Sequence, residues 1–122
     1  NLKMKKQATK LFAIVALFAT VLFASCKKEE TANPVASFTI SPNDTLNYNE
    51  TFTFTNTSTD ADSYLWNFGD ESTSTAVNPT KSDYAYPSEE GPCVISFVVT
   101  LTATKDGKSS TTSKTVYVNY CE

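Results

Sequence analysis

Tyr64-Leu65-Trp66-Asn67-Phe68-Gly69-Asp70 is the stretch of this 122-residue chain that decides its fold. Its three aromatic residues alternate with other residues, so a β-strand would place all three side chains on one face. We expect Trp66 to fill the centre of a core between two sheets, with Tyr64 and Phe68 beside it. Gly69 permits a backbone conformation that a Cβ would penalise, and Asp70 can accept hydrogen bonds from turn amides. These roles are structural, so the stretch specifies a fold and carries no catalytic chemistry.

Strand patterns continue on both sides of this stretch. Residues 35–40 and 51–55 precede it, and the second of these segments alternates Phe with Thr. Residues 93–103 alternate over eleven positions and form the strongest predicted strand, Asp106-Gly107 makes a hairpin turn, and residues 115–118 return. Six or seven short strands without a convincing helix predict an all-β protein folded as an antiparallel β-sandwich.

The stretch at 64–70 resembles the signature of PKD domains, immunoglobulin-like sandwiches with a Tyr-x-Trp-Asp/Asn-Phe-Gly-Asp core motif. The resemblance covers roughly Pro34 to Asn119 and implies a PKD-like domain over residues 34–122. Two departures are visible. Glu71 stands where the family usually has a second Gly, and residues 88–95 replace a short Pro-Gly-Thr turn with a longer approach to the next strand.

The first 25 residues are predicted to be a signal peptide. Four of the ten lysines lie within residues 1–10, and Leu11 to Ala24 is a run of fourteen residues with Thr20 as its only polar member. As a helix this run would be about 21 Å long, which is short of the roughly 30 Å hydrocarbon core of a bilayer. The alternative, a buried globular helix, is disfavoured because every face is apolar and nothing downstream could pack around it. We therefore expect a signal-peptide helix ahead of the sandwich.

Cys26 ends a segment, residues 22–26, that resembles a lipobox, the site at which a bacterial lipoprotein is acylated and cleaved. Ordinary cleavage after Ala24 or Ser25, with a free Cys26, is the alternative. Lys27-Lys28-Glu29-Glu30 resembles the export tag of Bacteroidota lipoproteins on the outer face of the outer membrane, although a plain solvated tether would look similar. We predict a lipid anchor on Cys26, a flexible tether over residues 26–33, and a lipid-anchored location at the cell surface.

Cys93 and Cys121 remain as an even pair, which in an oxidising compartment predicts a disulfide. A two-residue turn at 106–107 sets Cys93 opposite Tyr120, so Cys121 is one step out of register. Strict pairing would place the two thiols on opposite faces of the sheet. The bond therefore requires a bulge or fraying beyond Val118.

Charge and composition exclude several function classes. From Cys26 onward the chain has six lysines and all 13 acidic residues, so clustered basic residues for nucleic acid are missing. The sequence contains neither His nor Arg, which removes an imidazole base and a bidentate anion clamp, so we expect no enzyme and no cofactor. Asp60 and Asp62 could hold calcium, but a solvated turn is favoured because no further oxygen ligand is identifiable, and no metal site is predicted.

By its resemblance, the domain is expected to be a non-catalytic module for protein–protein or protein–carbohydrate contact. Its candidate contact residues are four tyrosines expected on the solvent side, namely Tyr48, Tyr84, Tyr86 and Tyr117, although plain packing in the sheet is the commoner role of a tyrosine on an edge strand. The alternative function is a structural spacer or an accessory subunit of a larger outer-membrane complex, or the N-terminal piece of a longer surface protein.

Overall fold

The computed structural model describes residues 29–86 and 91–121, and residues 32–122 form a compact unit of their own. The expected signal peptide, Cys26 and the first part of the tether lie outside the described residues. The described part of the chain consists of strands and turns, with no helix. It therefore contains no helix long and apolar enough to cross a membrane.

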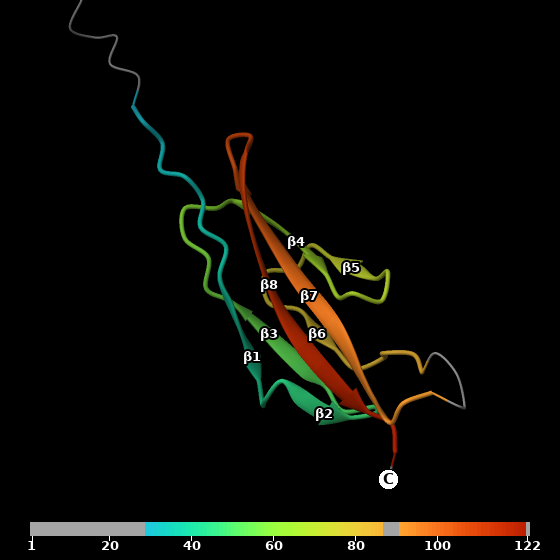
Figure 1. The fold of residues 1–122 in the computed structure, drawn as a ribbon. Helices are drawn as coiled ribbons and strands as arrows, with labels where there is room; N and C mark the ends of the chain where they lie inside the picture. Colours follow the sequence, from blue (N-terminus) through green and yellow to red (C-terminus); the bar gives the residue numbers. More distant parts are fainter. Residues whose placement is uncertain (1–28, 87–90, 122) are drawn as a thin grey trace, which may run out of the picture. The chain divides into compact units, whose positions relative to one another are not determined.

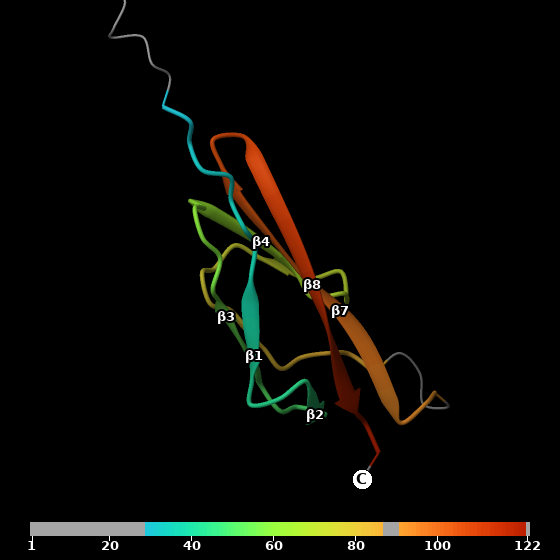
Figure 2. The ribbon, with the colours of Figure 1, turned by 60° about the vertical axis from the view of Figure 1, so that its left-hand side comes forward.

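Eight strands in the described residues form two facing sheets, as Figures 1 and 2 show from two directions. One sheet has three strands in the order β1-β3-β6 and the other has five in the order β2-β8-β7-β4-β5. The all-β, immunoglobulin-like sandwich expected from the sequence is thus confirmed. The strands are β1 Phe38–Ser41, β2 Thr45–Asn47, β3 Phe52–Asn56, β4 Ser63–Asn67, β5 Thr73–Ser74, β6 Thr80–Lys81, β7 Val94–Lys105 and β8 Lys108–Asn119.

One strand pair departs from the expected antiparallel arrangement. Strand β2 pairs with β8 in parallel, with Leu46 opposite Val118. The chain leaves the three-stranded sheet after β1 and joins the edge of the five-stranded sheet as β2 within a few residues. The sequence of Thr45–Asn47 does not predict this change of sheet, because a strand of three residues shows no periodicity.

The long β7–β8 hairpin has the register that the sequence predicts. Lys105 pairs with Lys108 across a turn in which Asp106 and Gly107 have φ angles of 49° and 75°, the left-handed values of a two-residue hairpin turn. Strand β8 is nevertheless much longer than the expected 115–118. Its first half is rich in Ser, Thr and Lys, so hydropathy does not reveal it, but pairing along β7 holds it in the sheet.

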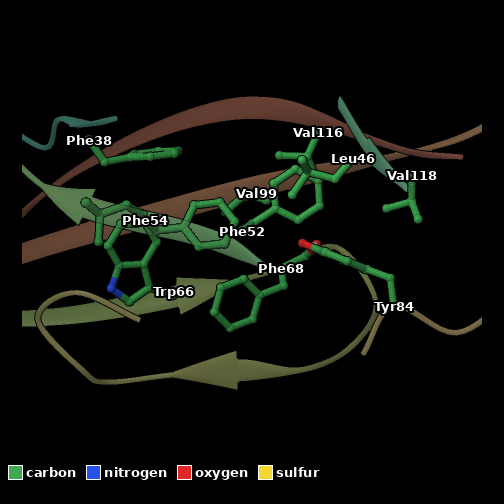
Figure 3. Packing of buried hydrophobic residues seen from close by; sticks show 11 residues of the cluster. Phe38, Leu46, Phe52, Phe54, Trp66, Phe68, Tyr84, Val99, Val116 and Val118 are labelled. Carbon is green, nitrogen blue, oxygen red and sulfur yellow. The ribbon is translucent and has the colours of Figure 1, made fainter. Parts of the chain in front are cut away.

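Aromatic side chains from the two sheets meet around Trp66, which is fully buried (Figure 3). The ring centroid of Phe38 lies 5.1 Å from that of Trp66, and that of Phe54 lies 5.8 Å away. The indole Nε1 donates to the Ala76 carbonyl at 2.9 Å, so the one polar atom of Trp66 is satisfied. Phe68 is buried and Tyr64 is half-buried on the same side, as expected for the motif.

The turn after the motif explains both its glycine and its departure from the family pattern. Gly69 has φ +84°, and a Cβ there would lie 2.7 Å from the Val98 carbonyl oxygen on β7. Glu71 has φ 69°, so this position adopts a left-handed conformation that Gly would occupy without a Cβ penalty. Asp70 accepts hydrogen bonds from the amide and the hydroxyl of Ser72, in agreement with its expected role in the turn.

Candidate functional site

Tyr84, one of the expected contact residues, is a core residue, and this expectation was wrong. Its side chain is 1% exposed, and its ring stacks on Phe97 with centroids 4.3 Å apart. Its hydroxyl donates to the Phe68 carbonyl at 3.3 Å, and Figure 3 shows the Tyr84 side chain pointing toward Phe68. Burial, reinforced by the nearby carboxylates of Asp70 and Asp83, raises the pKa of Tyr84. Tyr84 follows the short strand β6, and its side chain points into the core. It therefore offers no exposed ring to a ligand.

A buried ion pair lies beside Tyr84. Lys81 Nζ is 2.8 Å from Asp70 Oδ2 and 2.6 Å from Asp83 Oδ1, and it lies 5.1 Å from the centroid of the Tyr84 ring. Burial alone would raise the pKa of Asp70, but hydrogen bonds from Lys81 and Ser72 outweigh it and lower that pKa. The same pair raises the pKa of Lys81 against the opposite effect of burial. Both shifts favour the charged forms of Asp70 and Lys81. The ion pair is therefore maintained in the fold, which suits a structural role of the motif aspartate.

Three other tyrosines gather where β2 and β8 end. We call Tyr48, Tyr86 and Tyr120 the tyrosine cluster: the ring of Tyr120 lies between the other two, with centroids 5.2 Å from Tyr48 and 4.7 Å from Tyr86. Tyr48 is 49% exposed, whereas Tyr86 and Tyr120 are half-buried. Tyr117, the remaining expected contact residue, is exposed on the outer surface of the five-stranded sheet instead.

A hollow of about 370 Å³ opens beside this cluster. We call it the asparagine–tyrosine hollow, and its lining consists of Asn47, Tyr48, Asn49, Asn119, Tyr120 and Cys121. None of these described lining residues carries a charge. The parallel β2–β8 pair creates this site, because it sets Asn47 opposite Asn119 and lets the amide of Tyr48 donate to the Asn119 carbonyl at 2.8 Å.

Several hydrogen bonds connect the residues that line the hollow. Asn119 Nδ2 donates to Asn47 Oδ1 at 3.3 Å, and Asn119 Oδ1 accepts from the Cys121 amide at 3.2 Å. The turn after β2 closes through the Glu50 amide, which donates to the Asn47 carbonyl at 3.0 Å, with Asn49 at φ 67°. Asn tolerates this left-handed conformation better than most residues with a side chain.

Tyr48 and Tyr120 present different groups to a ligand. The Tyr120 hydroxyl donates to the Tyr84 carbonyl at 3.1 Å. Burial raises the pKa of Tyr120, and the neighbouring Tyr48 raises it further. This hydroxyl is committed to the fold. The hydroxyl of Tyr48 and the side-chain amide of Asn49 have no hydrogen-bond partner among the described residues. The hollow thus offers ring faces together with neutral donors and acceptors.

The Cys93–Cys121 disulfide closes the end of the hairpin beside the hollow, with Cα atoms 5.1 Å apart. The ladder ends at Val94 and Asn119, and the Tyr120 amide donates to the Cys93 carbonyl at 2.7 Å. Cys121 is thus the first residue past the regular pairing, where the strand leaves the sheet. This departure from register lets both sulfurs reach the same side.

Two other features carry less chemistry than the hollow. A second hollow, of about 510 Å³, is lined by Thr39, Ile40, Asp44, Lys114 and Thr115 and contains no aromatic ring. Asp60 and Asp62 are exposed in a turn that the Asp62 amide ties to the Thr104 carbonyl at 2.9 Å. The described residues include no group of three or more side chains that could hold a metal ion.

Sequence reasoning missed Tyr120 and the three asparagines of the hollow. A signal was present, because Asn47-Tyr48-Asn49 and Asn119-Tyr120 repeat the same pair of residue types 72 positions apart. The parallel pairing that joins them could not be predicted. Tyr48 was identified correctly as an exposed aromatic residue.

Comparisons with known proteins agree on one family. The family model described as PKD domain matches residues 37–118. The crystal structure of the PKD1 domain of Vibrio anguillarum Epp superposes with a TM-score of 0.56 at 28% identity, covering 75% of this chain and 100% of that one. That of the PKD1 domain from the Vibrio cholerae metalloprotease PrtV gives a TM-score of 0.53 at 34% identity, covering 72% and 99%. No curated protein sequence gives a match.

Proposed function

This chain belongs to the PKD domain family, and from that membership we propose that it is a non-catalytic contact module that binds a neutral glycan in the asparagine–tyrosine hollow. PKD domains are generally non-catalytic and occur in extracellular or surface proteins. The finer assignment, to a glycan and to this end of the domain, rests on the chemistry of the hollow.

The observation that carries the proposal is the pairing of an exposed aromatic ring with uncharged amides. A sugar has an apolar C–H face and a ring of hydroxyls, so it suits an aromatic face flanked by donors and acceptors. Tyr48 supplies the exposed face, while Asn49 and the rim of Asn47 and Asn119 supply the polar groups. An anionic polysaccharide is disfavoured, because no cation lines the hollow among the described residues.

Titration of residues 32–122 with neutral oligosaccharides, followed by calorimetry or chemical-shift changes, tests this proposal. We expect Tyr48→Ala to lower the affinity at least tenfold, since stacking on an exposed ring is the main contact. Tyr117→Ala is the matched control, because Tyr117 is similarly exposed, at 40%, but lies outside the hollow. Binding that survives Tyr48→Ala and is lost with Tyr117→Ala would refute the site, and the absence of binding to any neutral glycan would refute the function.

The second part of the proposal places this module at the cell surface through a lipid on Cys26. The support is the sequence: an apolar run of signal-peptide length, small residues before Cys26, and a lysine followed by two acids after it. Metabolic labelling with a fatty acid should mark the chain and should fail for Cys26→Ala. Digestion of intact cells by external protease should remove the domain. An unlabelled chain would show that Cys26 is not acylated, and protection from protease would place the domain inside.

A spacer function is the second candidate, favoured by one observation. The two solved structures named above are described as PKD1 domains, and one comes from a metalloprotease, so in that case the fold serves within a larger protein. A spacer predicts that Tyr48→Ala and Asn49→Ala leave every binding assay and the growth of the cell unchanged.

A further inference from the structure

The outer face of the five-stranded sheet has no charged residue at its paired positions, although residues 32–122 carry 11 acidic side chains and only four lysines. Alternate residues of β7 point away from the core, and the pairing register places them beside alternate residues of β8 and β4. We call this surface the neutral face. Its outward residues are Thr45 and Asn47 of β2, Ser63, Leu65 and Asn67 of β4, Thr73 of β5, Val94, Ser96, Val98, Thr100, Thr102 and Thr104 of β7, and Ser109, Thr111, Ser113, Thr115, Tyr117 and Asn119 of β8.

Large apolar side chains stand on the neutral face without cover from the described residues. Leu65, Val94 and Val98 are 48–54% exposed, and Tyr117 is 40% exposed. Three cross-strand hydroxyl pairs lie among them, with oxygen atoms 2.8, 3.3 and 2.8 Å apart between Thr100 and Ser113, Thr102 and Thr111, and Thr104 and Ser109. These hydroxyls are already paired, so burying them costs less than burying free polar groups.

The opposite surface of the sandwich provides an internal comparison. The outward positions of β1, β3 and β6 are likewise Ser and Thr, including Thr39, Thr53 and Thr55, but these strands expose no large apolar side chain. Polar strand surfaces therefore occur on both sides of the domain. Exposed Leu, Val and Tyr side chains occur together on the neutral face.

We propose that the neutral face is the interface of a homodimer, in which a second copy of this domain packs face to face. Two identical acidic domains repel each other wherever charged surfaces meet, but the neutral face brings no like charges together. The acidic side chains lie in the turns around it, including Asp44, Glu71 and Asp106, and would remain in solvent at the rim. An apolar centre with a polar rim is the usual anatomy of a protein interface. A basic or acidic partner would find no complementary charge here.

The size of the face corresponds to a small protein interface. Strands β7 and β8 have twelve residues each and extend for about 40 Å. Five strands at about 4.8 Å spacing give a width near 20 Å. Because the three outer strands have only two to five residues each, the five strands cover roughly 540 Å² for each copy. A dimer would thus bury about 1,100 Å² in total, just above the roughly 1,000 Å² of the smallest specific interfaces.

Sedimentation of residues 32–122 over a concentration series up to millimolar tests the dimer. We expect Val98→Lys, at the middle of β7, to raise the dissociation constant at least tenfold, because a symmetric contact then buries two like charges. Thr55→Lys, on the outward side of β3, is the matched control and should change the dissociation constant less than twofold. Thermal melts check that both variants fold. Only monomer at the highest concentration would overturn the proposal. A dimer that persists in Val98→Lys, or a monomer whose neutral face binds a glycan or another protein, would overturn it as well.

The neutral face and the hollow share Asn47 and Asn119 at one end of the face, but variants at other positions test the two proposals separately. Tyr48→Ala should leave the dissociation constant of the dimer unchanged, because Tyr48 follows β2 and lies in the hollow. Val98→Lys should leave glycan affinity unchanged.

Discussion

Gly69 and Gly107 share a left-handed backbone but have different surroundings. Gly69 has φ +84° and packs against the backbone of β7, whereas Gly107 has φ +75° and has nothing within 4 Å of the position of an added Cβ. We expect Gly107→Ala to lower the free energy of unfolding by about 1 kcal/mol, the cost of a left-handed Ala. Gly69→Ala should cost about 3 kcal/mol or more, because Val98 backbone atoms must also move. Urea denaturation of both variants measures the difference, and equal losses would show that no close contact exists at Gly69.

Tyr84 allows a second comparison within one residue. Tyr84→Ala should lower the free energy of unfolding by about 3–5 kcal/mol, because it empties a fully buried aromatic position. Tyr84→Phe keeps the ring and loses the hydrogen bond to the Phe68 carbonyl, so about 1 kcal/mol is expected. Denaturant unfolding at neutral pH provides both values. A Tyr84→Ala variant as stable as the parent would show that the Tyr84 side chain is not buried in the core.

Asp70 and Lys81 should make stability depend on pH at both ends of the range. Folding lowers the pKa of Asp70 below its ordinary 3.8, so its contribution is complete above that value and is lost as the pH falls through the folded pKa. Folding raises the pKa of Lys81 above 10.5, so its contribution is complete below that value and is lost as the pH rises through the folded pKa.

Asp70→Asn isolates the acid limb of this dependence. It should lower the free energy of unfolding at pH 7 by about 1–3 kcal/mol, the value of a hydrogen bond to a charged group. It should also flatten the loss of stability below pH 4. The matched control is Asp83→Asn, whose exposed carboxylate binds the same Lys81 and should matter much less. Thermal melts from pH 2 to 7 give both profiles, and an unchanged acid slope in Asp70→Asn would contradict the role of the pair.

At the scale of elements, the sequence predicts those strands whose side chains alternate between core and solvent. Strands β3, β4 and β7 show this pattern clearly, and the hairpin turn at Asp106-Gly107 follows from its residue types. The other elements are determined by pairing. Strands β2, β5 and β6 have two or three residues each, too few for a period, and the first half of β8 is polar on both sides. The hollow depends on β2, and so it could not be assembled from sequence patterns, although both of its Asn-Tyr segments were visible.

The Cys93–Cys121 bond links the open ends of β7 and β8 across a separation of 28 residues. Replacing both cysteines by Ala should lower the free energy of unfolding by about 2–4 kcal/mol, chiefly because the unfolded chain gains freedom. Since Cys121 lines the hollow, glycan affinity should fall as well. Reduction of the parent protein should reproduce both effects and leave the double variant unchanged. If reductant alters neither stability nor binding, the bond does not fix this end of the sandwich.

At the scale of the whole molecule, the boundary of the domain can be located physically. The family match begins at residue 37, yet the chain before it is already part of the sandwich. Val35 and Thr59 exchange backbone hydrogen bonds of 2.9 and 3.0 Å, and the Ala36 amide donates to the Ser110 hydroxyl at 3.0 Å. Pro34 and Ala36 are buried. The folding unit therefore starts earlier than the match, close to the expected boundary at residue 34.

Two truncated chains test this boundary. Residues 32–122 retain every contact of the compact unit, so they should unfold at the same denaturant midpoint as the chain that begins at residue 26. Residues 37–122 lose the Val35–Thr59 bridge and the buried side chains, and they should be less stable by about 2–3 kcal/mol. Equal midpoints for all three chains would place the boundary at residue 37. A loss already present in residues 32–122 would mean that the segment 26–31 contributes to folding and does not serve as a free tether.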